Sequence, residues 1–402
     1  MATKRKPVRR VSESNRAGRF VRVTTGEEPV RAFMPKPLPP SPPLEIDPNM
    51  QDLLDRANQA LGRLDGVTLL LPDPDLFLYS YVRKEAVLSS QIEGTQSSLS
   101  DLLLYEHNVT PGVPISDARE TSNYIRAMNH GIERVEGGFP ISLRLIKEMH
   151  GLLMHGVRGG HQTPGEFRRS QNWIGGSRPG TARFVPPPAH EVLPAIGALE
   201  KFLHDDPVQT PILVKSALAH AQFETIHPFL DGNGRVGRLL ITLLLCAERK
   251  VLRRPLLYLS LYLKENRDEY YDSLQRIRTE GAWEEWLRFF LEGVIEVSES
   301  ATKTTQEIVK LVESDRRQVH DTLGRAAGSA SRLHEIAIRE IVFMIPIAAK
   351  RLGLSEVTVG KAAGHLEALG IVSELTGRSR NKLYSYTGYL ALLNEGTETA
   401  LA

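Results

Sequence analysis

The sequence predicts a mainly α-helical protein that carries a small β-hairpin and a C-terminal winged helix-turn-helix. From about Met50 onward, apolar residues recur at three- and four-residue steps, which is the spacing of amphipathic helices. Residues 164–188, PGEFRRSQNWIGGSRPGTARFVPPP, interrupt this pattern with glycine, proline and aromatic residues. Near residue 335 the pattern changes again and predicts helix, turn, helix and two strands. A chain of 402 residues is long enough for two or three domains.

The N-terminus is strongly basic and then rich in proline. The first 22 residues carry eight lysines and arginines against a single acid, Glu13. We expect residues 1–28 to be a disordered, solvated tail, although a basic tail can also contact nucleic acid. The following PKPLPPSPPLEIDP predicts an extended polyproline arm, which opens an N-terminal helical region over residues 29–135.

The helical pattern divides into segments with recognisable ends. LLDRANQALGRLDGV predicts a first helix, and a second over Leu76–Ile92 ends at Gly94, a residue type that readily caps a helix C-terminus. Further helices, continuing to about residue 325, are expected over Ser98–Tyr105, Ser116–Glu136, Ile141–His155, Pro188–His204, Pro211–Thr225 and Gly232–Arg249. In the interrupting segment, NWI and ARFV are strand-like runs joined by the turn-forming GGSRPG, which predicts the hairpin.

The winged helix-turn-helix is predicted over residues 335–392. LGLS is a tight turn in which Ser355 caps the next helix, and TGRSRNK has the composition of a hairpin tip. The expected recognition helix, Glu356–Leu369, offers Thr358, Lys361 and His365 to a DNA groove, but also two glutamates. The wing could contact phosphates through Arg378, Arg380 and Lys382. DNA binding, protein docking and homodimerisation therefore all stay open for this domain.

Composition places the chain among ordinary globular proteins. It is 41% hydrophobic and has a formal net charge of +2, so nothing draws it as a whole toward nucleic acid or acidic membranes. Its only cysteine, Cys246, rules out an intrachain disulfide and favours a reducing compartment. No apolar run approaches the roughly 20 residues of a membrane span, and the N-terminus lacks the apolar segment of a signal peptide. We expect a cytoplasmic protein.

The most informative stretch is HPFLDGNGRVGR, residues 227–238, which leads directly into the apolar LLITLLLC. Gly232 and Gly234 let backbone N–H groups approach a ligand, and the helix that begins there adds its own free N–H groups and dipole. Arg235 and Arg238 contribute fixed charge and paired donors suited to phosphate oxygens. These features predict an anion site.

Three further residues of this stretch indicate which chemistry the anion site serves. Asp231 would repel phosphate unless a divalent cation such as Mg²⁺ bridges the two. His227 titrates near neutrality and can take a proton from an attacking hydroxyl. Asn233 can donate to phosphate or hold the loop in shape. Each residue alone would be an ordinary turn or surface residue, but their combination predicts a phosphoryl- or nucleotidyl-transfer site.

HPFLDGNGRVGR resembles the Fic family signature, H-x-F-x-[DE]-G-N-G-R-x-x-R, at every fixed position. The resemblance implies a Fic-type helical core over residues 136–325 with a β-hairpin flap. It also implies transfer of AMP from Mg·ATP to a Ser, Thr or Tyr hydroxyl of a target protein. By position, it implies that His227 is the general base and Asp231 the Mg²⁺ ligand. It further implies that Arg238 holds the γ-phosphate, and that the α- and β-phosphates are held by Gly232, Asn233, Gly234 and Arg235.

Two other segments extend the resemblance. QNWIGGSRPGTARFVPPP is similar to the family flap, whose backbone at Trp173, Ile174 and Gly175 would hold the target chain by strand addition. Tyr270 and Tyr271 stand where similar proteins have a tyrosine pair near the adenine. A role for this pair in the protein core is equally open.

SSQIEG, residues 89–94, resembles the inhibitory motif of the family, [ST]-x-x-x-E-[GN], with Ser89, Glu93 and Gly94 at its fixed positions. Ser89 and Glu93 are four residues apart and are expected to share one helix face. A carboxylate at Glu93 would pair with Arg238 and keep it from the γ-phosphate. The alternative is that Glu93 is one more surface charge.

Two other functions remain compatible with the sequence. One is removal of AMP from a modified protein in the same fold, with Glu93 positioning a water. The other is a DNA-binding regulator whose Fic-like core senses nucleotide. The sequence does not name a target protein.

Overall fold

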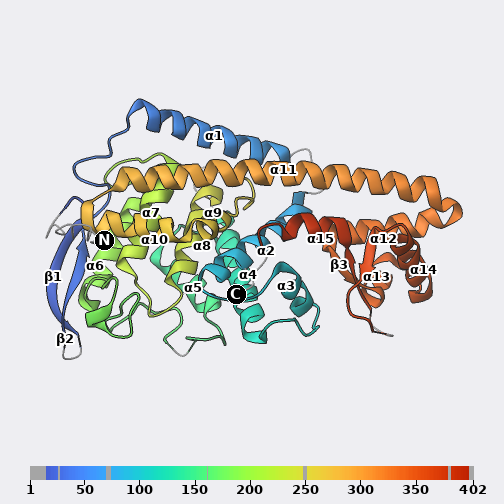
Figure 1. The fold of residues 1–402 in the computed structure, drawn as a ribbon, viewed down its shortest axis with the longest axis horizontal. Coiled ribbons are helices and arrows are strands. Elements are labelled where there is room, and N and C mark those ends of the chain that lie inside the picture. The colour runs from blue at the N-terminus through green and yellow to red at the C-terminus, as the bar shows by residue number, and fades with distance from the viewer. Residues whose placement is uncertain are drawn as a thin grey trace, which may run out of the picture. The chain divides into compact units, whose positions relative to one another are not determined.

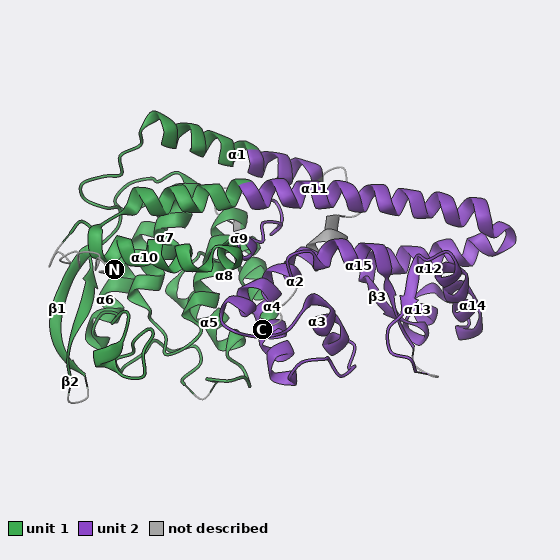
Figure 2. Cartoon of the chain, in the orientation of Figure 1, with its two compact units in different colours: residues 1–59, 126–251, 262–295 green, residues 60–125, 252–261, 296–402 purple. Residues whose placement is uncertain are grey.

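The computed structural model describes residues 15–25, 28–68, 74–160, 162–247, 251–378 and 382–397. The chain is mainly helical, as predicted, and the described part contains one two-stranded and one three-stranded sheet (Figure 1). It divides into two compact units (Figure 2). Unit 1 comprises residues 1–59, 126–251 and 262–295, and unit 2 comprises residues 60–125, 252–261 and 296–402. In these described ranges, no helix has both the length and the apolar character needed to cross a bilayer.

The core of unit 1 is built around α7 (Ile212–Ile226), of which every residue is buried. Its sequence, ILVKSALAHAQFETI, is mostly apolar or small and has no wholly polar face, as expected of a helix enclosed by others. The one lysine, Lys215, donates from Nζ to the carbonyl oxygen of Leu203 over 3.0 Å and pairs with Asp205 at 2.9 Å. Burial of this charge is therefore compensated.

The helices around α7 in unit 1 are mostly those that the periodicity predicts, with ends shifted by a few residues. They are α5 (Leu143–Leu153), α6 (Val192–Leu203), α8 (Asn233–Ala247), α10 (Arg267–Glu280) and the first part of α11 (Trp283–Leu323). Trp286 of α11 donates from its indole nitrogen to the Ala217 carbonyl of α7 over 2.8 Å. α1 (Pro48–Thr68), α4 (Ile115–Glu136), α9 (Ser260–Glu265) and α11 each begin in one unit and end in the other.

The expectation that residues 1–28 form a disordered tail is wrong for its last part. β1 (Gly18–Thr25) pairs in antiparallel register with β2 (Glu28–Pro35), so that Phe20 lies opposite Phe33. The arginines that suggested a solvated tail, Arg19 and Arg22, are exposed on opposite faces of β1, whereas Phe20, Val21 and Val23 of the same strand are partly buried. Val30 and Ala32 of β2 are buried in a small apolar cluster with Val185. Residues 1–14 lie outside the described residues, and residues 36–47, the proline arm, contain no helix or strand.

The predicted flap hairpin is present in reduced form. Ile174 and Phe184 form a single antiparallel bridge, in which Ile174 donates to Phe184 over 2.9 Å and accepts from it over 3.1 Å. A short 3₁₀ turn, η1 (Pro179–Thr181), occupies the tip. Gly175 and Gly176 adopt positive φ angles of 69° and 78°, and this local bend prevents a longer ladder. A second short 3₁₀ turn, η2 (Ala189–Glu191), leads from the flap into α6.

Unit 2 contains α2 (Pro74–Ile92) and α3 (Leu99–Glu106), followed much later in the sequence by the second part of α11. A capping box formed by Ser98 and Asp101 fixes the start of α3. After α11 and the 3₁₀ turn η3 (Gly324–Ala326), the chain forms α12 (Ala327–Glu340), β3 (Val342–Met344), α13 (Ile345–Leu352), α14 (Glu356–Ala368), β4 (Val372–Glu374), β5 (Leu383–Tyr386) and α15 (Thr387–Asn394).

The C-terminal elements follow the predicted order of helix, turn, helix and two strands. The strands form an antiparallel sheet in the order β3-β5-β4, to which β3 adds a strand that the sequence did not predict. Ser355 caps α14 as expected, because its hydroxyl accepts the Thr358 N–H over 3.2 Å. The tip of the predicted wing, including Arg380, lies outside the described residues.

Candidate active site

The predicted base, His227, lies at a strained backbone position. It is the C-cap of α7 and has a φ angle of 50° and a ψ angle of 60°, in the left-handed region that costs a non-glycine residue about 1–2 kcal/mol. Arg168 compensates for this, because its Nε donates to the His227 carbonyl over 2.9 Å. Arg168 is 2% exposed, and burial lowers its pKa to about 10, so the guanidinium remains charged at neutral pH.

Two asparagines fix the loop that follows. The Asn233 side chain accepts the Phe229 N–H over 2.8 Å and donates to the Phe229 carbonyl over 2.9 Å. Asn172, at the base of the flap, donates to the same carbonyl over 2.9 Å. Both atoms of the Asn233 amide are thus used within the loop. Of the two roles that the sequence allows for Asn233, the structure supports the one in loop shape.

His150 of α5 supports the same loop and was not predicted. Its ring is stacked on Phe229, with the ring centroids 3.7 Å apart and an interplanar angle of 8°. The N–H of Gly165 donates to Nδ1 over 2.8 Å, so Nε2 carries the proton and donates to the Asp231 carbonyl over 3.1 Å. Burial lowers the pKa of His150 to about 4, which keeps this tautomer neutral.

The carboxylate of Asp231 lies at the entrance of α8. Its Oδ1 accepts the Gly232 N–H over 2.6 Å, and its side chain is 45% exposed. Gly159 leaves room for the other oxygen, since a Cβ at that position would collide with Oδ2. Within the described ranges, no group of three or more acidic, histidine or cysteine side chains could hold a metal by itself. One open carboxylate fits a Mg²⁺ ion that brings phosphate oxygens as its other ligands.

The start of α8 has the features of a phosphate cradle. Gly232 adopts a φ angle of 77°, and the first helical hydrogen bond runs from Val236 N–H to its carbonyl over 3.1 Å. The N–H groups of the preceding turn are therefore directed out of the helix. Arg235 and Arg238 are 4% and 2% exposed, and the three-residue spacing places them on one face of α8. Arg235 also approaches Met154 Sδ at 3.6 Å.

Glu224 lies beside the His227 side chain, and Arg278 holds the end of α7 that carries both. The Glu224 carboxylate lies 3.9 Å from His227 Nδ1, a position that favours the protonated imidazole. Arg278 of α10 donates to the Glu224 carbonyl and to Thr225 Oγ1, each over 3.2 Å. Its guanidinium lies 3.8 Å from the ring centroid of Phe184, so it also joins the flap to the end of α7.

Comparison with known families gives the assignment of this arrangement. Residues 140–245 match the Fic/DOC family, and residues 51–133 match the Fic/DOC family N-terminal region. The chain carries a Fic domain. The resemblance seen in the sequence is thereby confirmed, and residues 227–238, which carry the site just described, lie within the matched region.

Named relatives agree with this assignment. The chain is 30% identical over 200 residues to "Protein adenylyltransferase Fic" of Drosophila erecta, covering 48% of this chain and 34% of the relative. It is 29% identical over 184 residues to a "Probable protein adenylyltransferase" of Aquifex aeolicus, covering 45% of this chain and 52% of the relative. The chain thus spans between about a third and a half of these two curated relatives.

A solved structure shares the fold. A Fic family protein from Desulfovibrio desulfuricans G20 aligns with a TM-score of 0.56 at 21% identity, covering 86% of this chain and 98% of that one. This chain therefore shares its overall helical fold with that protein.

The flap of the Fic domain presents an open strand edge. Because Ile174 bonds to Phe184, the peptide groups of Trp173 and Gly175 face the other way. Trp173 is 37% exposed. Of the predicted adenine contacts, Tyr270 is 1% exposed and its hydroxyl bonds His220 Nε2 over 2.8 Å, so it belongs to the core of the unit. Tyr271 is only partly buried.

SSQIEG lies in unit 2, at the end of α2. Ser89 is buried within the helix, but α2 ends at Ile92, so Glu93 is the first residue of the following turn. The expected helix face shared by Ser89 and Glu93 therefore does not form, because Glu93 lies one residue beyond the end of α2. Gly94 terminates the helix as predicted, with a φ angle of 98°.

Proposed function

We propose that this protein is a protein adenylyltransferase, which transfers AMP from ATP to a Ser, Thr or Tyr hydroxyl of a target protein. One observation carries the proposal: a histidine, an open carboxylate and an arginine-bearing helix N-terminus meet within the turn between α7 and α8. The relatives named as protein adenylyltransferases support it. The single cysteine agrees with action in the cytoplasm, where ATP is abundant.

ATP binding is assigned to the start of α8. The N–H groups of Gly232 to Arg235 hold the α- and β-phosphates, and Arg235 adds charge to the same cradle. Arg238, one turn further along, holds the γ-phosphate, and Tyr271 is assigned to the adenine. A bound Mg²⁺ neutralises phosphate charge, and Asp231 is the residue that would hold it.

The transfer step is assigned to His227. The imidazole accepts the proton of the target hydroxyl, and that oxygen forms a bond to the α-phosphorus of ATP. The bond from the α-phosphorus to the bridging oxygen of the β-phosphate breaks, and pyrophosphate leaves. Glu224, at 3.9 Å, stabilises the imidazolium that forms. The Arg168 and Asn172 contacts hold the His227 backbone in place during this step.

The target chain is assigned to the flap. Its backbone would add as a strand to the open edge at Trp173 to Gly175 and so hold the hydroxyl over the site. The inhibitory role is assigned to SSQIEG: Glu93 would pair with Arg238 and compete with the γ-phosphate, with Ser89 and Gly94 fixing the geometry of the turn. ATP would then bind without the bidentate hydrogen bonds from Arg238 to its γ-phosphate.

The test compares three proteins with labelled ATP and Mg²⁺. Glu93→Gly should label itself or an added target, whereas Glu93→Gly combined with His227→Ala should not. His190→Ala in the same background is the matched control, because His190 is an exposed histidine within η2. Mass spectrometry identifies the transferred group. Equal labelling in the presence and absence of His227, or release of AMP without any transfer, would overturn the proposal.

A further inference from the structure

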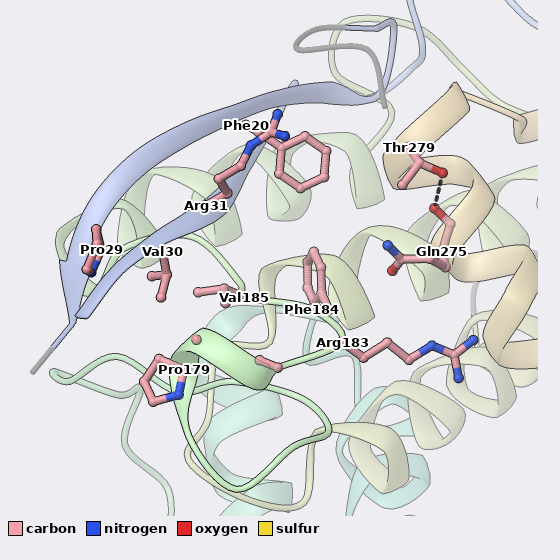
Figure 3. A pocket seen from close by; sticks show the side chains of 12 residues that line it. Phe20, Pro29, Val30, Arg31, Pro179, Arg183, Phe184, Val185, Gln275 and Thr279 are labelled. Atoms are coloured by element: carbon pink, nitrogen blue, oxygen red, sulfur yellow. Dashed lines mark hydrogen bonds between the residues drawn. The ribbon is translucent and has the colours of Figure 1, made fainter. Parts of the chain in front are cut away.

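Unit 1 has a pocket that the proposed reaction does not use, formed where the β1–β2 hairpin lies over the flap (Figure 3). We call it the hairpin pocket. Its volume is about 360 Å³, enough for one or two side chains. The hairpin contributes Phe20 and Arg31, the flap contributes Phe184 and Val185, and α10 contributes Gln275. Figure 3 shows Phe184 and Val185 pointing from the flap toward the hairpin.

The walls of the hairpin pocket are aromatic on one side and polar on another. Phe20 packs against Phe33 with ring centroids 5.0 Å apart, and Phe33 lies 6.3 Å from Phe184. On the α10 side, the Gln275 side-chain oxygen is buried and has no hydrogen-bond partner among the described residues. A buried acceptor without a partner costs free energy, so this atom favours an occupant that brings an N–H group.

The charge beside the pocket is unbalanced. Arg22 and Arg31 lie directly opposite one another in the hairpin register, and both are exposed. Like charges in this position repel, and neither has an acidic partner in the part of the chain that the structure describes. Other arginines of this region are paired with acids, as in the pairs Arg16–Glu284, Arg178–Glu28 and Arg183–Asp272. The guanidinium carbon of Arg31 lies 4.9 Å from the ring centroid of Phe20, so the rim of the pocket carries positive charge beside an aromatic ring.

The hairpin is held to the flap at two points. The N–H of Phe33 donates to the Val185 carbonyl over 2.9 Å. At the other end, the Glu28 carboxylate accepts from Arg178 Nη1 over 2.6 Å and from the Gly180 N–H over 2.8 Å. Any chain bound along the flap edge therefore lies at a fixed distance from the pocket.

We propose that the hairpin pocket binds an acidic segment of the target protein, a role that rests on the proposed transfer to a protein hydroxyl. A Glu or Asp side chain would pair with Arg31, reinforced by the opposing Arg22. An apolar neighbour would lie on Phe20, and a backbone N–H would reach Gln275. The pocket would then select targets by the sequence near the modified hydroxyl, while the flap edge holds any extended backbone.

The experiment measures binding without nucleotide, so that it does not depend on transfer. Immobilised peptides carry a central Thr flanked by Glu, by Gln or by Lys in otherwise random sequence, and the His227→Ala protein is applied. Glu-flanked peptides should bind about tenfold more tightly than Gln-flanked ones, and Arg31→Glu should remove this preference and shift it toward Lys. Added salt should weaken the preference.

The control is Arg19→Glu, with the same charge change in the same hairpin. Arg19 is exposed on β1 but points to the face opposite Arg22, so Arg19→Glu should bind Glu-flanked peptides as before. Arg31→Glu places an acid opposite Arg22, an attractive pair, and the hairpin should stay folded by circular dichroism.

Three results would overturn the inference: no preference for Glu, equal losses in Arg19→Glu and Arg31→Glu, or displacement of the peptides by duplex DNA through the same arginines. Transfer activity is measured separately on the protein with intact His227. Acid-selective binding without any transfer would refute the proposed function and leave the docking site standing. Transfer of AMP without a preference for acidic peptides would refute the docking site and leave the proposed function standing.

Discussion

Arg168 Nε donates a hydrogen bond of 2.9 Å to the carbonyl oxygen of His227, across 59 residues of sequence. The same guanidinium donates to the carbonyls of Ser170 over 3.1 Å and Pro187 over 2.6 Å, which lie on either side of the flap. One buried cation thus fixes both the strained turn that carries the proposed base and the two ends of the flap that would hold the target. Small errors in either position would misalign the hydroxyl and the imidazole.

Arg168→Lys should reduce both stability and transfer. An ammonium cannot reach three separate carbonyls as the planar guanidinium does, so acceptors are left buried without partners. We expect a loss of about 3 kcal/mol in the free energy of unfolding and a fall in transfer of more than about tenfold. Chemical denaturation and labelling with ATP measure the two effects. Arg169→Lys is the control, because Arg169 is exposed, and it should resemble the parent in both.

Gly159→Ala should impair Mg²⁺-dependent ATP binding more than Gly156→Ala. Both glycines have positive φ angles, 78° and 65°, so the backbone strain of the two substitutions is similar. Only at Gly159 does the added methyl group collide with Asp231 Oδ2, whereas nothing lies within 4 Å at Gly156. Isothermal titration with ATP and Mg²⁺ should show a loss of about tenfold or more for Gly159→Ala alone. Equal ATP affinities of Gly159→Ala and Gly156→Ala in the presence of Mg²⁺ would contradict the assignment of Asp231 as the metal ligand.

Stability should fall with acid partly because of His150. Its folded pKa is lowered from 6.5 to about 4 by burial, so the unfolded chain takes up the proton first as the pH falls. The contribution is complete above pH 6.5 and is lost between 6.5 and about 4, by roughly 3 kcal/mol in all. The difference in free energy of unfolding between the parent and His150→Gln should therefore become smaller as the pH falls from 6.5 to about 4. His155→Gln, at an exposed position, is the control substitution.

Glu93→Gly should raise the rate of transfer if Glu93 competes with the γ-phosphate for Arg238. The variant should also bind ATP more tightly, because Arg238 is then able to form its bidentate hydrogen bonds to the γ-phosphate. Gln96→Gly is the matched control, since Gln96 is exposed in the same loop after α2 and the change to glycine adds similar freedom. Comparable gains in both variants would show that loop flexibility, and not the Glu93 carboxylate, governs the rate.

The helices were largely predictable because their evidence is local. Apolar spacing, the Gly94 cap and the Ser355 cap depend on neighbours within a few residues, and the structure has them where the sequence places them. The β1–β2 hairpin was missed because its arginines resembled a solvated tail. The apolar residues beside these arginines, such as Val21 and Val23, indicate a strand only when their packing partner, here the cluster around Val185, is known.

The sequence by itself determined which residues are proposed for the chemistry, because HPFLDGNGRVGR holds the proposed base, metal ligand and phosphate cradle within one continuous turn. Only the tertiary structure decided what holds that turn in place. His150 contacts Asp231 across 81 residues, and Arg168 reaches His227 across 59. Such contacts leave no periodicity or spacing in the sequence, since they depend on which helices pack together. The same is true of the hairpin pocket, whose walls come from three separate segments that folding brings together.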